Sequence, residues 1–327
     1  MRKVIIAIIV FITLFFIADF IFYIGFKKLV FSKTFSGELG GKVNEYLYHQ
    51  RNVDFIIMGN SRAKYQINPT KLNNFYNGNG FNIAISGVGG IVYNDILLDV
   101  LKQKKRLPKA IILQIDAVAF ESENAEKNNG LPDNESFAVN GLLPFYESKM
   151  QRFNYYINYI PVQEKWKFCF KSFSFNGKVI NLLFNRLGKK EGPNDIKGYV
   201  GLNTFLKNEK ESKYQEETSD INSRVELRKS KLIALNAFLE VCKDNNIKLI
   251  TVLSPSYNNV LYRPLYNKQL IKYLEAKKVI VINYANINSM QNISGGIYWK
   301  DETHLNDMGA SIFSDTLNAV IGRMNSK

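Results

Sequence analysis

Residues 54–61 read Asp-Phe-Ile-Ile-Met-Gly-Asn-Ser, a short apolar run that ends in a glycine and leads directly into a serine. Such a run bounded by glycine is typical of a strand buried on both faces, as in a parallel sheet. The segment therefore predicts a buried strand with Ser61 on the turn at its carboxyl end. The structural alternative for Ser61 is a helix-capping serine.

Similar apolar runs recur along the chain and alternate with segments of helical periodicity. The further runs are 81–86, 109–115, 247–253 and 279–283, and the helical segments are 91–105, 225–244, 265–277 and 306–323. This alternation predicts an α/β fold, in which helices cover both faces of a parallel sheet and make three layers. In such sheets, reactive residues gather at the carboxyl ends of the strands.

The region of about 120–224 differs in texture from the rest of the chain. It is rich in Phe, Tyr, Asn and Lys, has weak periodicity and carries four prolines. We expect an insertion packed over one end of the sheet, as a lid or a substrate-binding surface. Its aromatic residues are more often plain packing than platforms for sugars. The chain then divides into an anchor (1–30), a juxtamembrane segment (31–53) and an α/β domain (54–327) that holds the insertion.

Residues 4–26 form a nearly unbroken apolar run with one charge, Asp19, inside it. The length suits a single transmembrane helix. Asp19 lies about 22 Å along such a helix from its first apolar residue, towards the far end, where its charge can approach the headgroups. A cleaved signal peptide with residues 4–18 as its apolar region is the alternative. We find no small-x-small cleavage site after it, which favours an uncleaved anchor.

Charges flank the apolar run on both sides. Arg2 and Lys3 favour a cytoplasmic N-terminus, whereas Lys27, Lys28 and Lys33 favour the opposite orientation, so charge alone leaves the orientation open. A short N-terminal tail before a lone anchor is compatible with a translocated main domain.

The net charge of +14 over 327 residues permits nucleic acid, an anionic membrane or an acidic polymer as a partner. The lysines are scattered, and no zinc-finger spacing or RNA-binding aromatic signature is present, so we expect a solvated surface and no nucleic-acid partner. The two cysteines, Cys169 and Cys242, form no Cys-x-x-Cys unit and suggest no metal site. Cys242 lies in an apolar helical pattern and reads as a small buried hydrophobe.

A second glycine follows the second predicted strand, in the stretch 82–87 (Asn-Ile-Ala-Ile-Ser-Gly). The Gly87 N–H could help to hold an oxyanion together with the N–H of Ser61. The alternative is a glycine that serves only a tight turn.

The most specific element is the stretch 298–310, which reads Tyr-Trp-Lys-Asp-Glu-Thr-His-Leu-Asn-Asp-Met-Gly-Ala. His304 is one of only two histidines, the other being His49. An aspartate three residues earlier, Asp301, can reach the imidazole locally and hold its tautomer, as the acid of a Ser-His-Asp group must. Asn306 is the expected N-cap of the last helix.

In this order, the three elements resemble the SGNH (GDSL-type) hydrolases. The resemblance is closest to membrane-anchored envelope members, such as the alginate O-acetylation proteins and the D-alanine transfer protein of teichoic acid synthesis. It covers about 54–116 and 247–320 and excludes the insertion. It implies Ser61 as nucleophile, Gly87 as an oxyanion residue, and Asp301 and His304 as the rest of a catalytic triad.

The sequence departs from the family pattern at two points. Asn60 stands where many relatives have aspartate, and the usual third-block oxyanion asparagine is not evident. The third strand instead runs into Asp116, which when ionised only accepts hydrogen bonds. Asn94 and Arg62 remain as candidates for a further oxyanion donor.

These residues support two expectations. The first is a serine esterase or O-acyltransferase, with acetyl as the acyl group implied by the resemblance, acting on a cell-envelope polysaccharide without a cofactor. The second is a catalytically weak or inactive protein of the same fold, which binds glycan and assembles with a membrane-bound O-acyltransferase. Both imply a bacterial cell membrane with the main domain extracytoplasmic.

Overall fold

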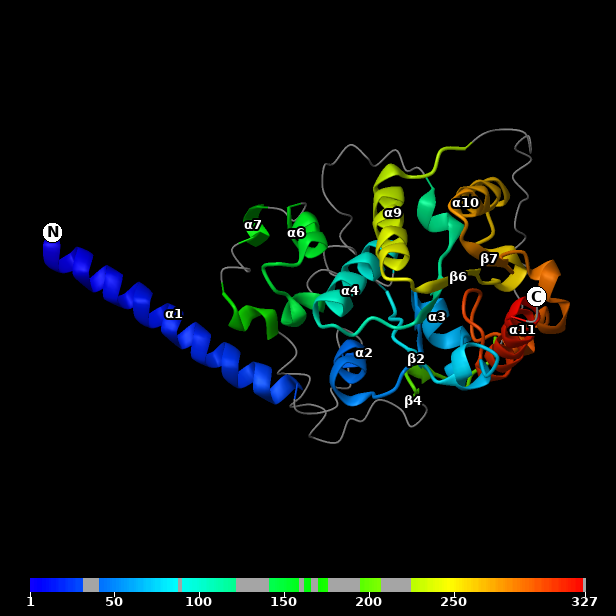
Figure 1. Cartoon of the computed structure of the whole chain (residues 1–327), viewed down its shortest axis with the longest axis horizontal. Coiled ribbons are helices and arrows are strands. Elements are labelled where there is room, and N and C mark those ends of the chain that lie inside the picture. Colours follow the sequence, from blue (N-terminus) through cyan, green and yellow to red (C-terminus); the bar gives the residue numbers. More distant parts are fainter. Residues whose placement is uncertain are drawn as a thin grey trace.

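The computed structural model (Figure 1) describes residues 1–31, 41–87, 90–121, 141–158, 162–165, 170–175, 195–206 and 225–325. Its centre is a five-stranded sheet in the order β2-β1-β3-β6-β7, in which every pairing is parallel. The strands are β1 (Phe55–Met58), β2 (Gly80–Asn82), β3 (Ala110–Gln114), β6 (Lys248–Leu253) and β7 (Ile280–Asn283). The predicted α/β class with a parallel sheet is confirmed.

Helices flank both faces of this sheet, because successive side chains of a strand point to opposite sides. On β1, Ile56 and Met58 belong to one apolar cluster, while Phe55 and Ile57 belong to the other. The first cluster includes residues of α4 (Ile91–Gln103), α9 (Lys229–Asp244) and α10 (Pro264–Ala276). The second includes residues of α3 (Ser61–Gln66) and α11 (Asp307–Asn325). The four helices expected at 91–105, 225–244, 265–277 and 306–323 are thus present within a few residues.

Short elements connect these layers. They are α2 (Gly41–Asn44), the π-helix η1 (Glu45–His49), and the 3-10 helices η2 (Pro69–Lys71), η3 (Tyr76–Gly78), η4 (Ala117–Phe120), η9 (Tyr257–Asn259), η10 (Ile287–Ile293) and η11 (Gly296–Tyr298).

The strand expected at 81–86 is shorter than predicted and ends at Asn82. The Asn82 side chain is buried and donates to the carbonyls of Ala63 (2.8 Å) and Ile67 (2.9 Å), while its oxygen accepts the N–H of Ala84 (3.1 Å). These bonds turn the chain and tie the end of β2 to α3. The backbone N–H of Asn82 donates to Lys197 O (2.8 Å), so the short hairpin of β4 (Asp195–Ile196) and β5 (Tyr199–Val200) covers this sheet edge.

Much of the expected insertion lies outside the described residues, namely 122–140, 159–161, 166–169, 176–194 and 207–224. Cys169 belongs to this part of the chain, and so does much of the segment for which a lid was expected. The described parts are η6 (Leu143–Phe145), α6 (Gln151–Ile157), α7 (Val162–Lys165), η8 (Ser172–Phe175), β4 and β5. Of these, α6 packs on α4, where Arg152 pairs with buried Asp95. Helix α6 therefore lies against the side of the sheet domain, whereas η8 packs on α1 (Arg2–Phe31).

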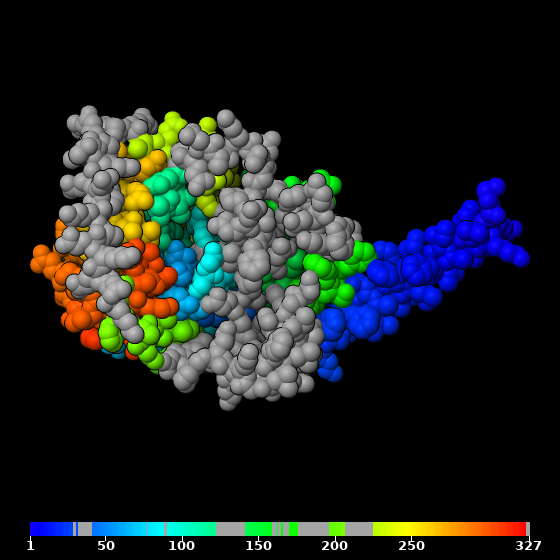
Figure 2. Space-filling model, turned by 180° about the vertical axis from the view of Figure 1, so that it is seen from behind, coloured from blue at the N-terminus to red at the C-terminus, as the bar shows by residue number. Residues whose placement is uncertain are grey.

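Helix α1 (Arg2–Phe31) projects from the body of the molecule, and described parts of residues 141–175 adjoin its base (Figure 2). Its segment Arg2–Lys28 is long and apolar enough to cross a membrane, a test that a signal sequence near the N-terminus also passes. Cys242 in α9 is buried, as expected, and burial raises the pKa of its thiol to about 12.

Candidate active site

Ser61 lies on a tight turn at the carboxyl end of β1 and is the first residue of α3. The turn depends on Gly59, whose φ of +145° lies in the region that favours glycine. A Cβ at this position would lie 2.8 Å from Gln114 O and 2.8 Å from the Ala63 Cβ. Gly59 therefore lets the backbone pass close to β3 while turning Ser61 towards the site.

The loop that carries Asp301 and His304 is closed at its base. Trp299 and Leu305 form an antiparallel bridge, and the N–H of Lys300 donates to His304 O over 2.9 Å. The Trp299 indole is fully buried. Directly after the loop, Asn306 Oδ1 accepts the N–H of Gly309 (3.0 Å), which confirms Asn306 as the N-cap of α11.

Ser61, His304 and Asp301 form a continuous hydrogen-bonded series. The Ser61 Oγ is 2.7 Å from His304 Nε2, and His304 Nδ1 is 2.9 Å from each oxygen of the Asp301 carboxylate. Because Nδ1 faces a carboxylate, it carries the ring proton and leaves Nε2 free to accept the serine hydroxyl. The structure thus brings together the three residues predicted for the triad, in the order that general-base activation of a serine requires.

Several donors hold the Asp301 carboxylate in its ionised form. Partial burial raises its pKa, but hydrogen bonds from the His304 ring, the Thr303 N–H and the Thr303 hydroxyl outweigh that effect, so the pKa lies well below its usual range. The His304 side chain is 21% exposed and that of Asp301 is 43% exposed. The two side chains are therefore only partly covered, and they lie at the surface of the protein.

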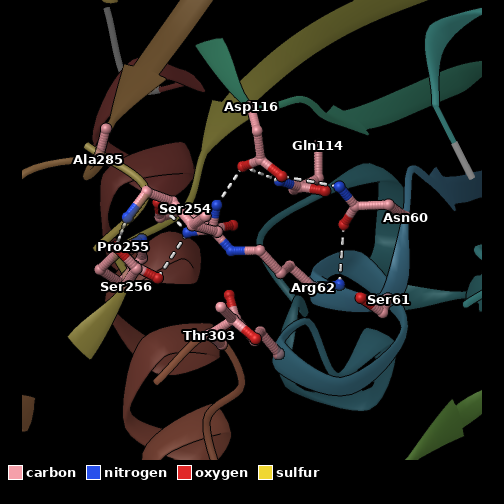
Figure 3. Close-up of polar contacts among 12 residues, drawn as sticks. Asn60, Ser61, Arg62, Gln114, Asp116, Ser254, Pro255, Ser256, Ala285 and Thr303 are labelled. Atoms are coloured by element: carbon pink, nitrogen blue, oxygen red, sulfur yellow. Dashed lines mark hydrogen bonds and ion pairs between the residues drawn. The ribbon is translucent and has the colours of Figure 1, made fainter. Parts of the chain in front are cut away.

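The residue after the serine, Arg62, forms a buried ion pair with Asp116 (Figure 3). Arg62, 3% exposed, pairs through Nη1 with Oδ1 of Asp116, which is 8% exposed. Its Nη2 donates to the carbonyls of Ser254 and of Pro255, the latter over 2.6 Å. Burial lowers the pKa of the guanidinium, and the Asp116 carboxylate opposes that effect. The pair joins the carboxyl ends of β1, β3 and β6.

The Asp116 carboxylate also accepts hydrogen bonds from two side-chain amides, those of Asn60 and Gln114. Asn60 Nδ2 donates to Asp116 Oδ2 (2.7 Å), and Gln114 Nε2 donates to Asp116 Oδ1 (2.8 Å). The other end of the Asn60 amide accepts the N–H of Arg62 (2.8 Å) and caps α3. Asp116, whose role the sequence left open, thus positions the residues that flank Ser61 on both sides.

The two side chains considered as extra oxyanion donors are engaged elsewhere. The Arg62 guanidinium extends away from Ser61 into the buried cluster around Asp116 (Figure 3). The Asn94 amide, in the first turn of α4, donates to Gly90 O over 2.9 Å. Neither side chain has a described contact with the Ser61 hydroxyl.

Gly87 occupies an exposed turn with a φ of +81°. Its neighbour Ser86 donates through Oγ to the Tyr65 hydroxyl (3.0 Å), and the Tyr65 ring meets the His304 ring edge-on at 5.5 Å between centroids. This series of contacts places the turn on the His304 side of the site. The next residues, 88–89, lie outside the described residues.

The sequence did not single out Thr303, Tyr65 or Asn82. The Thr303 hydroxyl lies 2.9 Å from Asp301 Oδ1 and 3.0 Å from His304 Nδ1. Its position between the two predicted residues was a usable signal, because side chains in a tight loop contact their sequence neighbours. Tyr65 and Asn82 make their contacts with residues of other elements, so no pattern among their sequence neighbours pointed to them.

Among the described residues, no three His, Cys, Asp or Glu side chains are grouped as a metal site would require. Fold and site together define an α/β protein with a Ser-His-Asp arrangement at the carboxyl end of a parallel sheet. No model of a known protein family matches the chain, and a comparison with curated proteins gives no match either.

Proposed function

We propose that the protein is a serine-dependent acyl esterase or O-acyltransferase of the SGNH type. The observation that carries the proposal is the 2.7 Å contact between Ser61 Oγ and His304 Nε2, with Asp301 on the far side of the ring. A serine on a glycine turn after a buried strand, and an Asp-x-x-His loop before the last helix, are the features in which the sequence resembles that family.

In the proposed reaction, Ser61 Oγ attacks the carbonyl carbon of an acyl ester, and its proton passes to His304 Nε2. Asp301 stabilises the imidazolium that forms. The tetrahedral intermediate collapses, and His304 returns the proton to the leaving alkoxide. Water or a sugar hydroxyl then gives its proton to His304 and attacks the acyl-enzyme, and Ser61 leaves with that proton restored. Backbone N–H groups of Ser61 and Gly87 are the proposed oxyanion donors.

The proposed acceptor is a cell-envelope polysaccharide and the proposed acyl group is acetyl, both because of the family resemblance. We further propose that α1 is an uncleaved anchor in a bacterial cell membrane, with the main domain extracytoplasmic. Contacts between α1 and the domain support an uncleaved helix: Phe31 stacks on Phe145 at 5.4 Å, and Tyr23 meets Phe175 at 5.8 Å between ring centroids. Removal of α1 would expose these aromatic surfaces.

A second candidate function is glycan binding without efficient catalysis, in assembly with a membrane-bound O-acyltransferase. The placement of Asp116 favours it, because an acceptor follows β3 where an oxyanion donor is expected, and Arg62 is consumed by that acceptor. Loss of one oxyanion donor costs about two to three orders of magnitude in turnover. Such a protein would retain the fold and the surface that binds glycan, while its catalytic turnover would be low.

A fluorophosphonate probe separates the two candidates, because it labels only an activated serine. The full chain in detergent is compared with Ser61→Ala, His304→Ala and the control Ser86→Ala, which removes a different serine next to the site. Labelling of the wild type and the control, but of neither Ser61→Ala nor His304→Ala, supports the enzyme. A correctly folded wild type that does not label contradicts it and favours the binding function.

A further inference from the structure

The short segment 170–175 packs on the middle and the C-terminal half of α1. The Phe170 ring lies 5.4 Å from Phe15 and 6.0 Å from Phe16, measured between centroids. Further along the helix, Phe175 lies 6.5 Å from Phe26. These residues are about 150 positions from α1 in sequence, so the contact is a tertiary one and not a local turn.

The same segment satisfies the one charged side chain inside the apolar helix. The Asp19 carboxylate accepts the N–H of Lys171 (2.9 Å), the N–H of Ser172 (3.0 Å) and the Ser172 hydroxyl (2.5 Å). The residue is only 9% exposed, whereas Phe11 on the same helix is 69% exposed. Asp19 therefore binds the start of η8. The carboxylate supplies acceptors for two backbone N–H groups and a hydroxyl, and these supply the donors that a carboxylate needs in an apolar surrounding.

The depth of this contact follows from the length of α1. Lys3 and Lys27 flank its apolar part, and at about 1.5 Å per residue they lie roughly 36 Å apart along the helix. A hydrocarbon layer of about 30 Å centred between them has its midplane near Phe15. Asp19 then lies about 6 Å from the midplane and about 9 Å from the far edge of the layer, so it lies deeper than the position near the headgroups expected from the sequence. The residues that touch Phe15 and Asp19, which are Phe170, Lys171 and Ser172, then lie inside it as well. Phe175, which packs against Phe26, lies at the edge of the layer.

We propose that segment 170–175 enters the lipid bilayer beside α1, so that the membrane contact of this protein is a packed pair of segments and not a single helix. Asp19 is the polar link that holds the pair together. The Lys171 side chain fits this placement, since its Nζ lies 5.6 Å from the Phe20 ring and 5.9 Å from the Tyr23 ring, on the way to the C-terminal end of α1. A lysine that enters hydrocarbon extends its amine towards the headgroups in this manner.

This inference rests on the anchor of the proposed function and goes beyond it. A lone helix followed by a linker leaves its domain free to tumble, whereas two segments fixed to each other hold the domain at one orientation to the membrane. Segment 170–175 is then a second part of the chain, besides α1, that contacts the acyl chains of the lipid bilayer.

Quenching by brominated lipids tests the depth directly. The full chain carries Cys169→Ser and Cys242→Ala, and a bimane probe is attached at Ser174→Cys, at Phe15→Cys on α1, or at the exposed position Lys300→Cys. Each variant is placed in phosphatidylcholine vesicles brominated on the acyl chains. We expect quenching at positions 174 and 15 and none at 300. Quenching at 15 without quenching at 174 overturns the inference and leaves the anchor intact. Absence of quenching at both positions overturns the anchor as well.

A second measurement tests the role of Asp19. Three proteins that all carry Ser174→Cys are compared: one with no other change in α1, one with Asp19→Leu and one with Thr13→Leu. The quantity measured is the rate at which a membrane-impermeant maleimide labels the cysteine. Thr13 is a matched control, because its hydroxyl donates to Ile9 O within α1. Hydrogen bonds to a charged acceptor are the stronger kind, so Asp19→Leu is expected to raise the rate at least roughly tenfold. Thr13→Leu leaves it unchanged. Equal rates in all three proteins contradict a link through Asp19.

Discussion

Asn60 and Asp116 lie 56 positions apart in sequence, and Asn60 Nδ2 donates to Asp116 Oδ2 over 2.7 Å. The two residues follow β1 and β3, the neighbouring strands between which the strand order of the sheet changes direction. In open parallel sheets, ligands bind outside the carboxyl ends of the strands at this switch point. The bond places Asn60, the residue before Ser61, at that point. The position of Ser61 therefore depends on how firmly the ends of β1 and β3 are held together.

Removal of Asp116 is expected to destabilise the protein strongly. Asp116→Ala leaves the Arg62 guanidinium buried without its counter-charge, so the free energy of unfolding should fall by about 3–5 kcal/mol. Urea unfolding in detergent, followed by intrinsic fluorescence, measures the change. Serine labelling should fall in the folded fraction too, because Asn60 and Arg62 both lose their acceptor.

A double-mutant cycle shows whether this loss belongs to the pair. Arg62→Met alone leaves the Asp116 carboxylate buried, whereas Arg62→Met combined with Asp116→Ala removes both charges. The double variant should therefore lose less stability than the sum of the two single losses, with a coupling of about 1 kcal/mol or more. Additive losses would show that the ion pair does not hold these strand ends together.

Asp301→Asn should disable the serine without disturbing the fold. An amide in place of the carboxylate does not hold the Nδ1–H tautomer, so His304 no longer presents a free Nε2 to Ser61. We expect the fluorophosphonate labelling rate to fall by about four orders of magnitude, as for other Ser-His-Asp groups. Circular dichroism and the unfolding midpoint serve as controls for folding. A rate within tenfold of the wild type would contradict the assigned role of Asp301.

Gly59→Ala should destabilise the turn that presents Ser61. The added Cβ would meet a backbone oxygen of β3 at 2.8 Å, in a φ region that alanine rarely adopts. We expect a loss of more than about 2 kcal/mol in unfolding free energy, together with slower serine labelling. Gly90→Ala is the matched control, since a Cβ added there would meet no atom within 4 Å and the φ of Gly90 is −68°. Equal stability of the two variants would contradict the packing argument.

The buried carboxylate of Asp95 should make stability depend on pH. Burial raises its pKa to about 6, although Arg152 (2.7 Å) and the Tyr156 hydroxyl (2.9 Å) oppose the shift. Between about pH 4 and pH 6 the folded state retains a proton that the unfolded state has released, so stability falls as pH rises, by up to about 1.4 kcal/mol per unit. Above pH 6 the contribution is constant.

Urea unfolding of the wild type and of Asp95→Asn, from pH 4 to pH 8 in detergent, isolates this contribution. The difference in unfolding free energy between the two proteins should change below pH 6 and stay level above it. A difference that is flat over the whole range would show that Asp95 does not titrate in this window.

The sequence was most informative where one residue pattern acts locally. Four apolar residues before Gly59 predicted β1, because a strand buried on both faces has no polar side to display. Asp301 and His304 were found together because both side chains lie in one closed loop. Local patterns of this kind determine backbone direction and the contacts of residues a few positions apart.

Contacts between distant segments had no such signal. Asn82 ends β2 early because its amide bonds to α3 and its N–H bonds to Lys197, a partner more than 100 positions away. Arg62 was a candidate oxyanion donor from its place beside the serine, yet Asp116 and two carbonyls after β6 engage it. A charge at a strand end can face solvent, substrate or another strand, and only the folded arrangement decides among them.

The cluster around Arg62 also constrains how this protein can change over evolutionary time. One guanidinium joins the ends of three neighbouring strands, and each partner contributes a group that is buried with it. Replacement of Arg62 or of Asp116 alone passes through a sequence with an uncompensated charge in the interior, and loss of Asp116 also removes the acceptor of the Asn60 amide. Relatives that differ here should therefore have exchanged Asn60, Arg62 and Asp116 as a set, and a library that varies these three positions jointly should yield folded variants that stepwise mutation does not reach.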